Sequence, residues 1–207
     1  MNINQHWENI YQNKSDSEVS WYQEIPHTSL KLLSQLDLSL YEPIIDVGGG
    51  NSNLARELYA KGYRDITVLD ISQAVINRKK EELGEVADHI QWSVGDVLDL
   101  HQSKTYRIWH DRAVFHFFTD LVDIQQYISI VDNHVAQNGY VILSTFSKNG
   151  PEKCSGLTVS RYSIDELNGL FSDRFHLIKG FEDVHTTPFG TDQKFAHVVL
   201  KKIKIGL

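Results

Sequence analysis

Short apolar runs alternate with longer amphipathic segments along most of the chain. The runs PIIDV, DITVLD, HIQWSV, YRIWHD and GYVILSTF predict strands at residues 43–47, 65–70, 89–94, 106–111 and 139–146. Helices are expected after Asn51, from Ser72 and near Asp120, and the Ser72 hydroxyl can cap its helix. This alternation is typical of a parallel sheet with helices on both of its faces.

The pattern changes after residue 146. The stretch SKNGPEKCSGLTVSRY predicts a loop, and SIDELNGLF predicts a short helix capped by Ser163. The runs FHLIKGFEDV and FAHVVLKKI, separated by TTPFGTDQ, predict a hairpin at one edge of the sheet. Residues 1–42 hold two candidate helices and too little apolar content for a core of their own. We therefore expect one domain over residues 1–207, with residues 1–42 as an extension of it.

Composition and charge narrow the functional classes. The chain has 207 residues, 41% hydrophobic content and a formal net charge of -7, as in a folded globular protein. The acidic balance argues against a nucleic-acid partner, and the basic clusters at 78–80 and 201–204 are expected to be solvated. No apolar stretch reaches the roughly 18 residues that span a bilayer, and the first residues do not resemble a secretory signal, so we expect a cytoplasmic protein without a membrane partner.

The sequence IIDVGGGNSNLA, residues 44–55, places three glycines between a predicted strand and a predicted helix. Such a turn lets the backbone approach a ligand closely. A phosphate-binding P-loop needs Lys and then Ser or Thr after the last glycine, and Asn51 stands there instead. A dinucleotide fingerprint matches at Gly48 and Gly50, but Asn53 replaces its third glycine, which leaves an NAD-dependent oxidoreductase as a weak alternative.

Three aspartates end or follow successive predicted strands. Asp46 ends the first strand, Asp70 ends the second, and Asp96 follows the third. Ligands of open α/β sheets bind outside the carboxyl ends of the strands, where Asp70 could accept from ribose hydroxyls and Asp96 from an adenine amino group. Each could instead cap a strand end or be solvated. Together with the glycines, they indicate a site for a nucleoside-bearing ligand.

The order DVGGG, VLD and GDV, followed by an apparent hairpin, resembles the class I S-adenosylmethionine-dependent methyltransferases over nearly the whole chain. The segments WENIY, SWY, WHDRAVFHF, GPEKCSGL, RY and HTTPFGTDQKF resemble a subgroup that includes protein-lysine methyltransferases such as the citrate synthase lysine methyltransferase. The resemblance implies an α/β fold with a Rossmann-like, seven-stranded, mostly parallel sheet and an antiparallel last strand. It also implies that residues 1–42 form a lid and residues 43–207 a cofactor-binding core.

The resemblance further implies S-adenosylmethionine as cofactor, with S-adenosylhomocysteine as product. Carried over by motif, the cofactor-binding residues are Asp46, Gly48 and Gly50 beside the methionine portion, Asp70 at the ribose, Ile71, Asp96 and Val97 at the adenine, and Tyr11 and Trp21 in the lid. Ile71 could equally be a helix-packing residue. The motif departs from the commoner family form at Gly49, often cysteine or another small residue, and at Ser52, where glycine is common.

Methyl transfer from a sulfonium is an in-line displacement that requires an aligned, uncharged nucleophile. Asp111 at the end of the fourth predicted strand could orient His110 or His116, so that a histidine accepts a proton. The alternative interpretation pairs Asp111 with Arg112 in a structural salt bridge and places the histidines in the core.

The substrate-binding candidates are Arg112, Arg161, Tyr162 and His185, of which the last three could also be ordinary exposed loop residues. The single cysteine, Cys154, excludes an intrachain disulfide and is interpreted as a small buried residue. No close spacing of metal ligands supports a zinc site, so no metal is expected. The leading hypothesis is methyl transfer to a protein lysine. The alternatives are a small-molecule N-, O- or S-methyltransferase and a cofactor-binding interaction protein without turnover.

Overall fold

A computed structural model describes residues 2–101 and 103–203. The chain divides into two compact units. The first comprises Met1–His101 and Thr187–Phe189, and the second comprises Gln102–Thr186 and Gly190–Leu207. The expected organisation as one domain with an N-terminal lid stays a prediction, as does the cytoplasmic location. Within the described residues, no helix is both long and apolar enough to cross a membrane.

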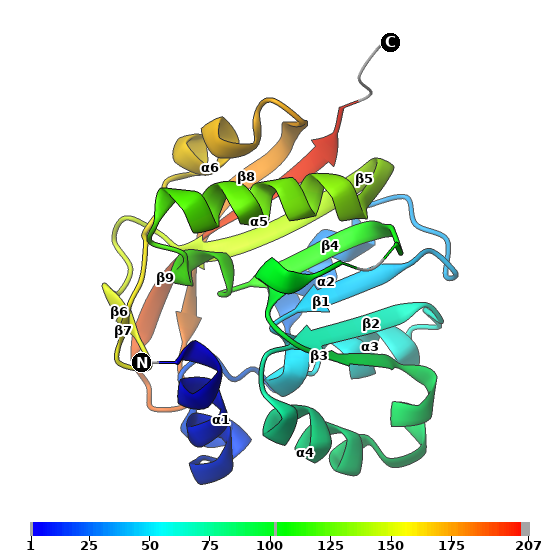
Figure 1. Cartoon of the computed structure of the whole chain (residues 1–207), viewed down its shortest axis with the longest axis vertical. Coiled ribbons are helices and arrows are strands. Elements are labelled where there is room, and N and C mark those ends of the chain that lie inside the picture. The colour runs from blue at the N-terminus through cyan, green and yellow to red at the C-terminus, as the bar shows by residue number, and fades with distance from the viewer. Residues whose placement is uncertain (1, 102, 204–207) are drawn as a thin grey trace. The chain divides into compact units, whose positions relative to one another are not determined.

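The first unit contains three parallel strands, and its strands and helices alternate as predicted (Figure 1). The strands are β1 (Ile44–Val47), β2 (Ile66–Asp70) and β3 (Gln91–Val94). The helices are α1 (Ile3–Asn13), α2 (His27–Ser34), α3 (Leu54–Ala60) and α4 (Gln73–Leu83), with short 3₁₀ helices η1 (Asp16–Glu18), η2 (Gly49–Asn51), η3 (Gly84–His89) and η4 (Val97–Asp99). Every residue of β1 and β2 is buried, which explains why both strands read as continuous apolar runs.

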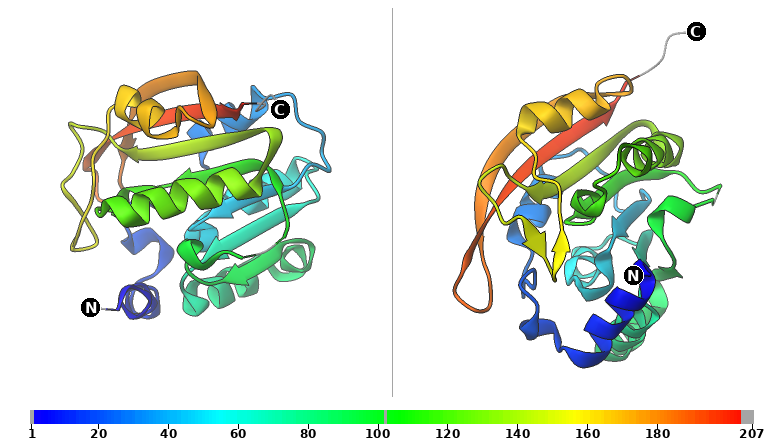
Figure 2. Two further views of the ribbon diagram at one scale, coloured as in Figure 1. Left: turned by 45° about the horizontal axis from the view of Figure 1, so that its top comes forward. Right: turned by 60° about the vertical axis from the view of Figure 1, so that its left-hand side comes forward.

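The second unit contains the remaining strands of the sheet. They are β4 (Tyr106–Arg112), β5 (Val135–Phe146), β8 (Phe175–Thr186) and β9 (Asp192–Lys202). The helices are α5 (Leu121–His134), α6 (Ile164–Phe171) and the 3₁₀ helix η5 (Phe115–Phe117). Strands β4 and β5 are parallel, whereas β9 runs antiparallel to both β5 and β8. Figure 2 shows β8 and β9 as a long curved hairpin, as the closing apolar runs predicted.

The seven strands have the order β3-β2-β1-β4-β5-β9-β8. This order confirms the predicted seven-stranded, mostly parallel sheet with an antiparallel last strand. The predicted caps are also confirmed: Ser72 Oγ accepts from the backbone N–H of Val75 at 3.3 Å, and Ser163 forms a capping box with Glu166.

Two segments differ from the prediction. Strand β5 begins at Val135 rather than at Gly139, because Val135 already pairs with Tyr106 of β4. The pairing is irregular around Asn138, whose φ is 63°, and continues with Tyr140 opposite Ile108. The predicted loop after residue 146 contains a small hairpin, β6 (Lys153–Cys154) and β7 (Leu157–Thr158). Its two-residue turn, Ser155 and Gly156, has positive φ at both positions, which suits the twist of a tight hairpin.

Candidate functional site

The glycine turn after β1 leaves no room for side chains. Gly48 has a φ of 68°, in the left-handed region that favours glycine. A Cβ on Gly49 would lie 2.4 Å from Asp46 Oδ2, and a Cβ on Gly50 would lie 2.4 Å from Val75 Cγ1 and 2.8 Å from Asp70 Oδ2. A side chain at Gly49, the position that departs from the commoner family form, would therefore require the Asp46 carboxylate to shift.

Asp70 ends β2 with its carboxylate buried against this turn. One oxygen accepts from the N–H of Gly50 and the other from the N–H of Ser72, each at 3.0 Å. Burial raises the pKa of Asp70 to about 6, with a smaller increase from nearby Asp46, and the two backbone hydrogen bonds partly offset this. Because a carboxylate offers about four acceptor positions, the group can still accept from a ligand.

The remaining predicted cofactor residues of the strand ends lie in the first unit as well. Ile71 directly follows Asp70, and the N–H of Gly95, just before Asp96, donates to the carbonyl of Asp70 at 2.9 Å. Asp96 Oδ1 accepts from the N–H of Leu98 at 2.9 Å and so caps η4. Val97 is buried. The ends of β2 and β3 are thus tied together. The contact of Ile71, Asp96 and Val97 with a cofactor stays a prediction.

The N-terminal aromatic residues form a cluster. Tyr11 packs on Trp7 with ring centroids 6.1 Å apart, and Trp21 meets both rings edge-on at 5.7 Å and 6.2 Å. Trp7 and Tyr11 are buried, and the Arg78 guanidinium lies over the Tyr11 ring at 5.8 Å. The cluster anchors α1 within the first unit. A role of Tyr11 and Trp21 in covering the cofactor stays a prediction.

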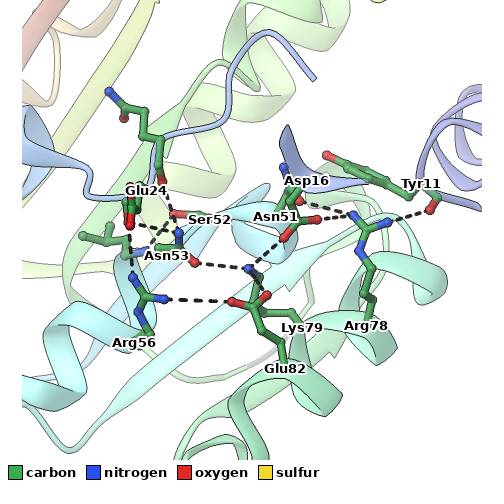
Figure 3. Close-up of polar contacts among 12 residues, drawn as sticks. Tyr11, Asp16, Glu24, Asn51, Ser52, Asn53, Arg56, Arg78, Lys79 and Glu82 are labelled. Carbon is green, nitrogen blue, oxygen red and sulfur yellow. Dashed lines mark hydrogen bonds and ion pairs between the residues drawn. The ribbon is translucent and has the colours of Figure 1, made fainter. Parts of the chain in front are cut away.

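The basic cluster at residues 78–80 was expected to be solvated, and this expectation is wrong for two of its three residues. Lys79 is only 2% exposed. Arg78 donates to the backbone carbonyl of Tyr11 (Figure 3) and also to that of Lys14. Lys80 is exposed, and the Arg78 side chain is 32% exposed. Apart from Glu82, the partners of Arg78 and Lys79 lie far away along the chain, so the local sequence does not indicate their burial.

In the second unit, Asp111 is completely buried and closes the turn after β4. Its carboxylate accepts from the Tyr127 hydroxyl at 2.5 Å, from the N–H of Val114 at 2.9 Å and from the N–H of Phe115 at 3.1 Å. Burial raises the pKa of Asp111 to about 6, against the lowering effects of these donors and of nearby His110. His110 is itself buried. The hydrogen bonds of Asp111 thus hold the local backbone and α5.

His116 is buried as a neutral hydrogen-bond donor. Its Nδ1 accepts from the N–H of Phe146 at 3.4 Å, so the ring proton resides on Nε2. Burial and, to a smaller extent, the positive charge of Arg112 together lower the pKa of His116 to about 3. Among the described residues, Nε2 has no hydrogen-bond partner. This geometry suits donation to a ligand better than the predicted role as proton acceptor.

The predicted substrate-binding residues separate into two sets. The Arg112 guanidinium lies 4.8 Å over the Phe195 ring, and the buried His185 ring lies 6.2 Å from the same ring. Cys154 is buried as expected, and burial raises the pKa of its thiol to about 12 although the charge of Arg112 lowers it. Arg112, His116 and His185 therefore lie around the start of β9 and the end of β5.

Arg161 and Tyr162 have structural contacts. The Arg161 guanidinium donates to the carbonyls of Lys148 and Gly150 and pairs with Glu152 at 2.9 Å, which fixes the loop after β5. The Tyr162 ring stacks on Phe115 with centroids 5.4 Å apart. Their predicted contact with substrate stays untested.

Comparison with known proteins identifies the domain. Residues 44–139 match the family described as methyltransferase domain. A solved S-adenosylmethionine-dependent methyltransferase from Anabaena variabilis aligns with 98% of this chain and 96% of its own, with a TM-score of 0.75 and 15% identity. Residues 44–139 thus form a methyltransferase domain, and the chain has the fold of a solved S-adenosylmethionine-dependent methyltransferase.

Relatives of this methyltransferase act on different kinds of acceptor. The eEF1A lysine and N-terminal methyltransferase of Mus musculus is 29% identical over 141 residues, 66% of this chain. The match spans only 19% of that relative's length. A Burkholderia thailandensis 1,6-didemethyltoxoflavin-N1-methyltransferase, solved with S-adenosylhomocysteine, aligns with 98% of this chain and 88% of its own, with a TM-score of 0.72 and 13% identity.

Sequence reasoning missed several buried polar residues of the methyltransferase. His197 bridges three strands, with Nδ1 2.8 Å from Ser144 Oγ and Nε2 2.7 Å from Asp183 Oδ1. Ser144 lies fully buried within β5, so the three residues stabilise the sheet and present no exposed nucleophile. Tyr127 and Asn51 were also missed. The residues next to these buried polar side chains do not indicate their roles, because each side chain interacts with partners on other helices or strands.

We expect Gly50→Ala to destabilise the methyltransferase by about 1–3 kcal/mol, because the added methyl would overlap Val75 and the Asp70 carboxylate. Thermal unfolding of the ligand-free protein measures this. Gly95→Ala is the matched control, since a Cβ there meets nothing within 4 Å. Equal melting temperatures for the two variants would contradict the close packing of the turn.

Proposed function

We propose that this protein transfers a methyl group from S-adenosylmethionine and that its first unit binds this cofactor. The observation that carries the proposal is the buried Asp70 carboxylate, which lies against Gly50 in a turn with no space for a side chain. A buried carboxylate with remaining acceptor positions suits the two hydroxyls of a ribose. The cofactor supplies the electrophilic methyl group when it is bound.

The cofactor would be held by residues at the carboxyl ends of the first three strands. We assign Asp46, Gly48 and Gly50 to the methionine portion, Asp70 to the ribose, and Ile71, Asp96 and Val97 to the adenine. Tyr11 and Trp21 are proposed to cover it. The fit is supported by the close packing of Gly49 and Gly50 against the carboxylates of Asp46 and Asp70 and by the negative charge of these carboxylates, which suits a sulfonium.

We propose a protein lysine as the acceptor. Support comes from the relative described as an eEF1A lysine methyltransferase and from the motifs shared with protein-lysine enzymes. A lysine must lose a proton before it attacks, because its amine is charged near neutral pH. Of the three proposed catalytic residues, Asp111 holds the turn after β4, and the geometry of His116 suits donation through Nε2. We therefore propose His110, which directly precedes Asp111 on β4, as the proton acceptor.

The second candidate is a small-molecule acceptor that carries an oxygen or a negative charge. It is favoured by the two groups near the start of β9, the Arg112 guanidinium and the Nε2–H of His116, which can only donate. One structural neighbour, described as a 1,6-didemethyltoxoflavin-N1-methyltransferase, was solved with the small molecule 1,6-didemethyltoxoflavin bound.

Incubation of the purified protein with methyl-labelled S-adenosylmethionine and a cell lysate tests the proposal. Label in a protein band supports the lysine acceptor, and label only in small products supports the second candidate. Asp70→Asn protein is the control for background transfer. Tight cofactor binding without labelled product would indicate an interaction protein without turnover. Absence of cofactor binding in calorimetry with folded protein would overturn the proposed function.

The donor role of His116 gives a separate prediction. In His116→Asn, the amide oxygen can replace Nδ1 as acceptor for Phe146, but nothing replaces Nε2–H. In His116→Gln, the longer amide can place a donor near the position of Nε2. We expect the KM for the acceptor found by labelling to rise about tenfold in His116→Asn and to change little in His116→Gln. The reverse order would contradict the assignment.

A further inference from the structure

Asn51 ends the glycine turn with a buried side chain, 3% exposed. Its Oδ1 accepts from Arg78 Nη2 at 3.3 Å. A guanidinium can only donate, so the atom of Asn51 that faces Arg78 must be the oxygen. The amide orientation is therefore determined, and Nδ2 must point away from Arg78.

The Nδ2 of Asn51 is a buried donor that has no hydrogen-bond partner in residues 2–101 and 103–203. Leaving such a donor without an acceptor costs about 1–3 kcal/mol. A ligand with an oxygen at this position would relieve that cost. Asn51 lies in the same turn as Gly49 and Gly50, where an added Cβ would overlap Asp46, Val75 and Asp70.

Arg78 is itself held firmly. It donates to the carbonyl of Tyr11 at 2.8 Å and pairs with Asp16 at 2.5 Å (Figure 3). It also donates to the carbonyl of Lys14 at 2.8 Å. The next residue, Lys79, joins the same Asp16 at 3.2 Å and Glu82 at 2.7 Å. The amide of Asn51 is thus fixed by a cation that three other groups hold in place.

Asn53 provides a contrast within the same loop. Its Nδ2 donates to the carbonyls of Gln23 and Glu24 at 3.2 Å and 3.1 Å, and its Oδ1 accepts from Lys79 at 3.2 Å. Both polar atoms of the Asn53 amide are used within the protein, as Figure 3 shows. Of these two asparagines, Asn51 alone retains a donor for a ligand.

We propose that Asn51 Nδ2 donates to the carboxylate of the methionine portion of the bound cofactor, and that Arg78 is the positioning residue that fixes this amide. The carboxylate is the negative group of the cofactor, and the positive charge of Arg78 beside Asn51 favours that group over a hydroxyl. The inference rests on the proposed cofactor binding and adds a residue that recognises the amino-acid end of the ligand.

Calorimetry with two ligands tests this assignment. S-adenosylhomocysteine carries the carboxylate, and methylthioadenosine lacks the amino-acid portion. In Asn51→Asp, one oxygen can still accept from Arg78, and the other replaces the donor by a negative charge. We expect the affinity for S-adenosylhomocysteine to fall at least about tenfold and the affinity for methylthioadenosine to stay within about twofold. Equal losses for both ligands, or no loss, would overturn the proposal.

Asn53→Asp is the matched control, because it changes a buried asparagine that has no free donor. We expect it to lower the melting temperature without changing the ratio of the two affinities. Arg78→Gln should lower the affinity for S-adenosylhomocysteine in the wild-type background and change it little in Asn51→Asp, since Arg78 acts through Asn51. Additive losses would contradict the positioning role. If wild-type protein binds neither ligand, the proposed function fails instead.

Discussion

Asp70→Asn is expected to weaken S-adenosylmethionine binding by about ten- to hundredfold. Hydrogen bonds to a charged group contribute about 1.5–3 kcal/mol, and 1.4 kcal/mol corresponds to about tenfold in affinity. In the variant, one carboxylate oxygen becomes an NH₂ group that faces either Gly50 or Ser72, whose N–H groups also donate. The ribose hydroxyls then lose the charged acceptor. Calorimetry at about pH 7.5, above the pKa of Asp70, measures the change in affinity.

The raised pKa adds a pH dependence to the same prediction. Ribose hydroxyls donate to the ionised carboxylate, so binding favours ionisation of a group whose pKa is about 6 in the free protein. Affinity should be full well above about pH 6 and should decrease as the pH falls through this value, by up to about tenfold per pH unit. Asp70→Asn should lack this decrease. A wild-type affinity that is constant between about pH 5 and about pH 8 would contradict the role of Asp70.

The raised pKa of Asp70 also makes the stability of the folded protein depend on pH, in the opposite direction to the cofactor affinity. The carboxyl groups of Asp70 and Asp111 have an ordinary pKa of 3.8, and their pKa in the folded protein is about 6. Between these values the folded protein binds more protons than the unfolded chain, so the contribution to stability decreases as the pH rises through about 6. Asp70 and Asp111 therefore contribute least to the stability of the ligand-free folded protein above about pH 6, where the protein should bind the cofactor most tightly.

The sequence predicts those parts of the structure that depend on neighbouring residues. The apolar runs of β1 and β2 identified fully buried strands, and Ser72 and Ser163 marked helix starts through their own hydroxyls. The glycine turn and Asp70 were located because their spacing relative to the strands is a local property. The order of elements was then enough to predict the fold class.

Contacts between distant segments could not be predicted in this way. Nothing near Arg78 and Lys79 shows that Asp16 will neutralise them, so a run of basic residues looked solvated. Asn53 was interpreted only as a replacement for the third glycine of a dinucleotide fingerprint. In the structure, its amide donates to the carbonyls of Gln23 and Glu24. Asp111 looked like a partner of a histidine, because Tyr127 follows only on the next helix.

Asp111→Asn is expected to destabilise the protein by about 2–4 kcal/mol. The amide keeps one oxygen, but its NH₂ group faces buried donors, namely the Tyr127 hydroxyl or the N–H groups of Val114 and Phe115. Each donor left without an acceptor costs about 1–3 kcal/mol. Urea unfolding at several pH values measures the loss. The loss should shrink as the pH rises through about 6, because the wild-type carboxylate then becomes charged in its buried site.

Tyr127→Phe separates the structural role of Asp111 from a catalytic one. It removes the hydroxyl that donates to Asp111 and that accepts from Trp109 Nε1 at 3.0 Å, while the carboxylate itself remains. If Asp111 stabilises the turn after β4, both variants lose stability, and the labelled product per folded molecule stays within about threefold of wild type at saturating cofactor. If Asp111 instead orients a proton acceptor, Asp111→Asn loses turnover at unchanged stability while Tyr127→Phe retains it. That second outcome would show that Asp111 takes part in the methyl transfer. It would contradict the structural role in which Asp111 connects the end of β4 to α5.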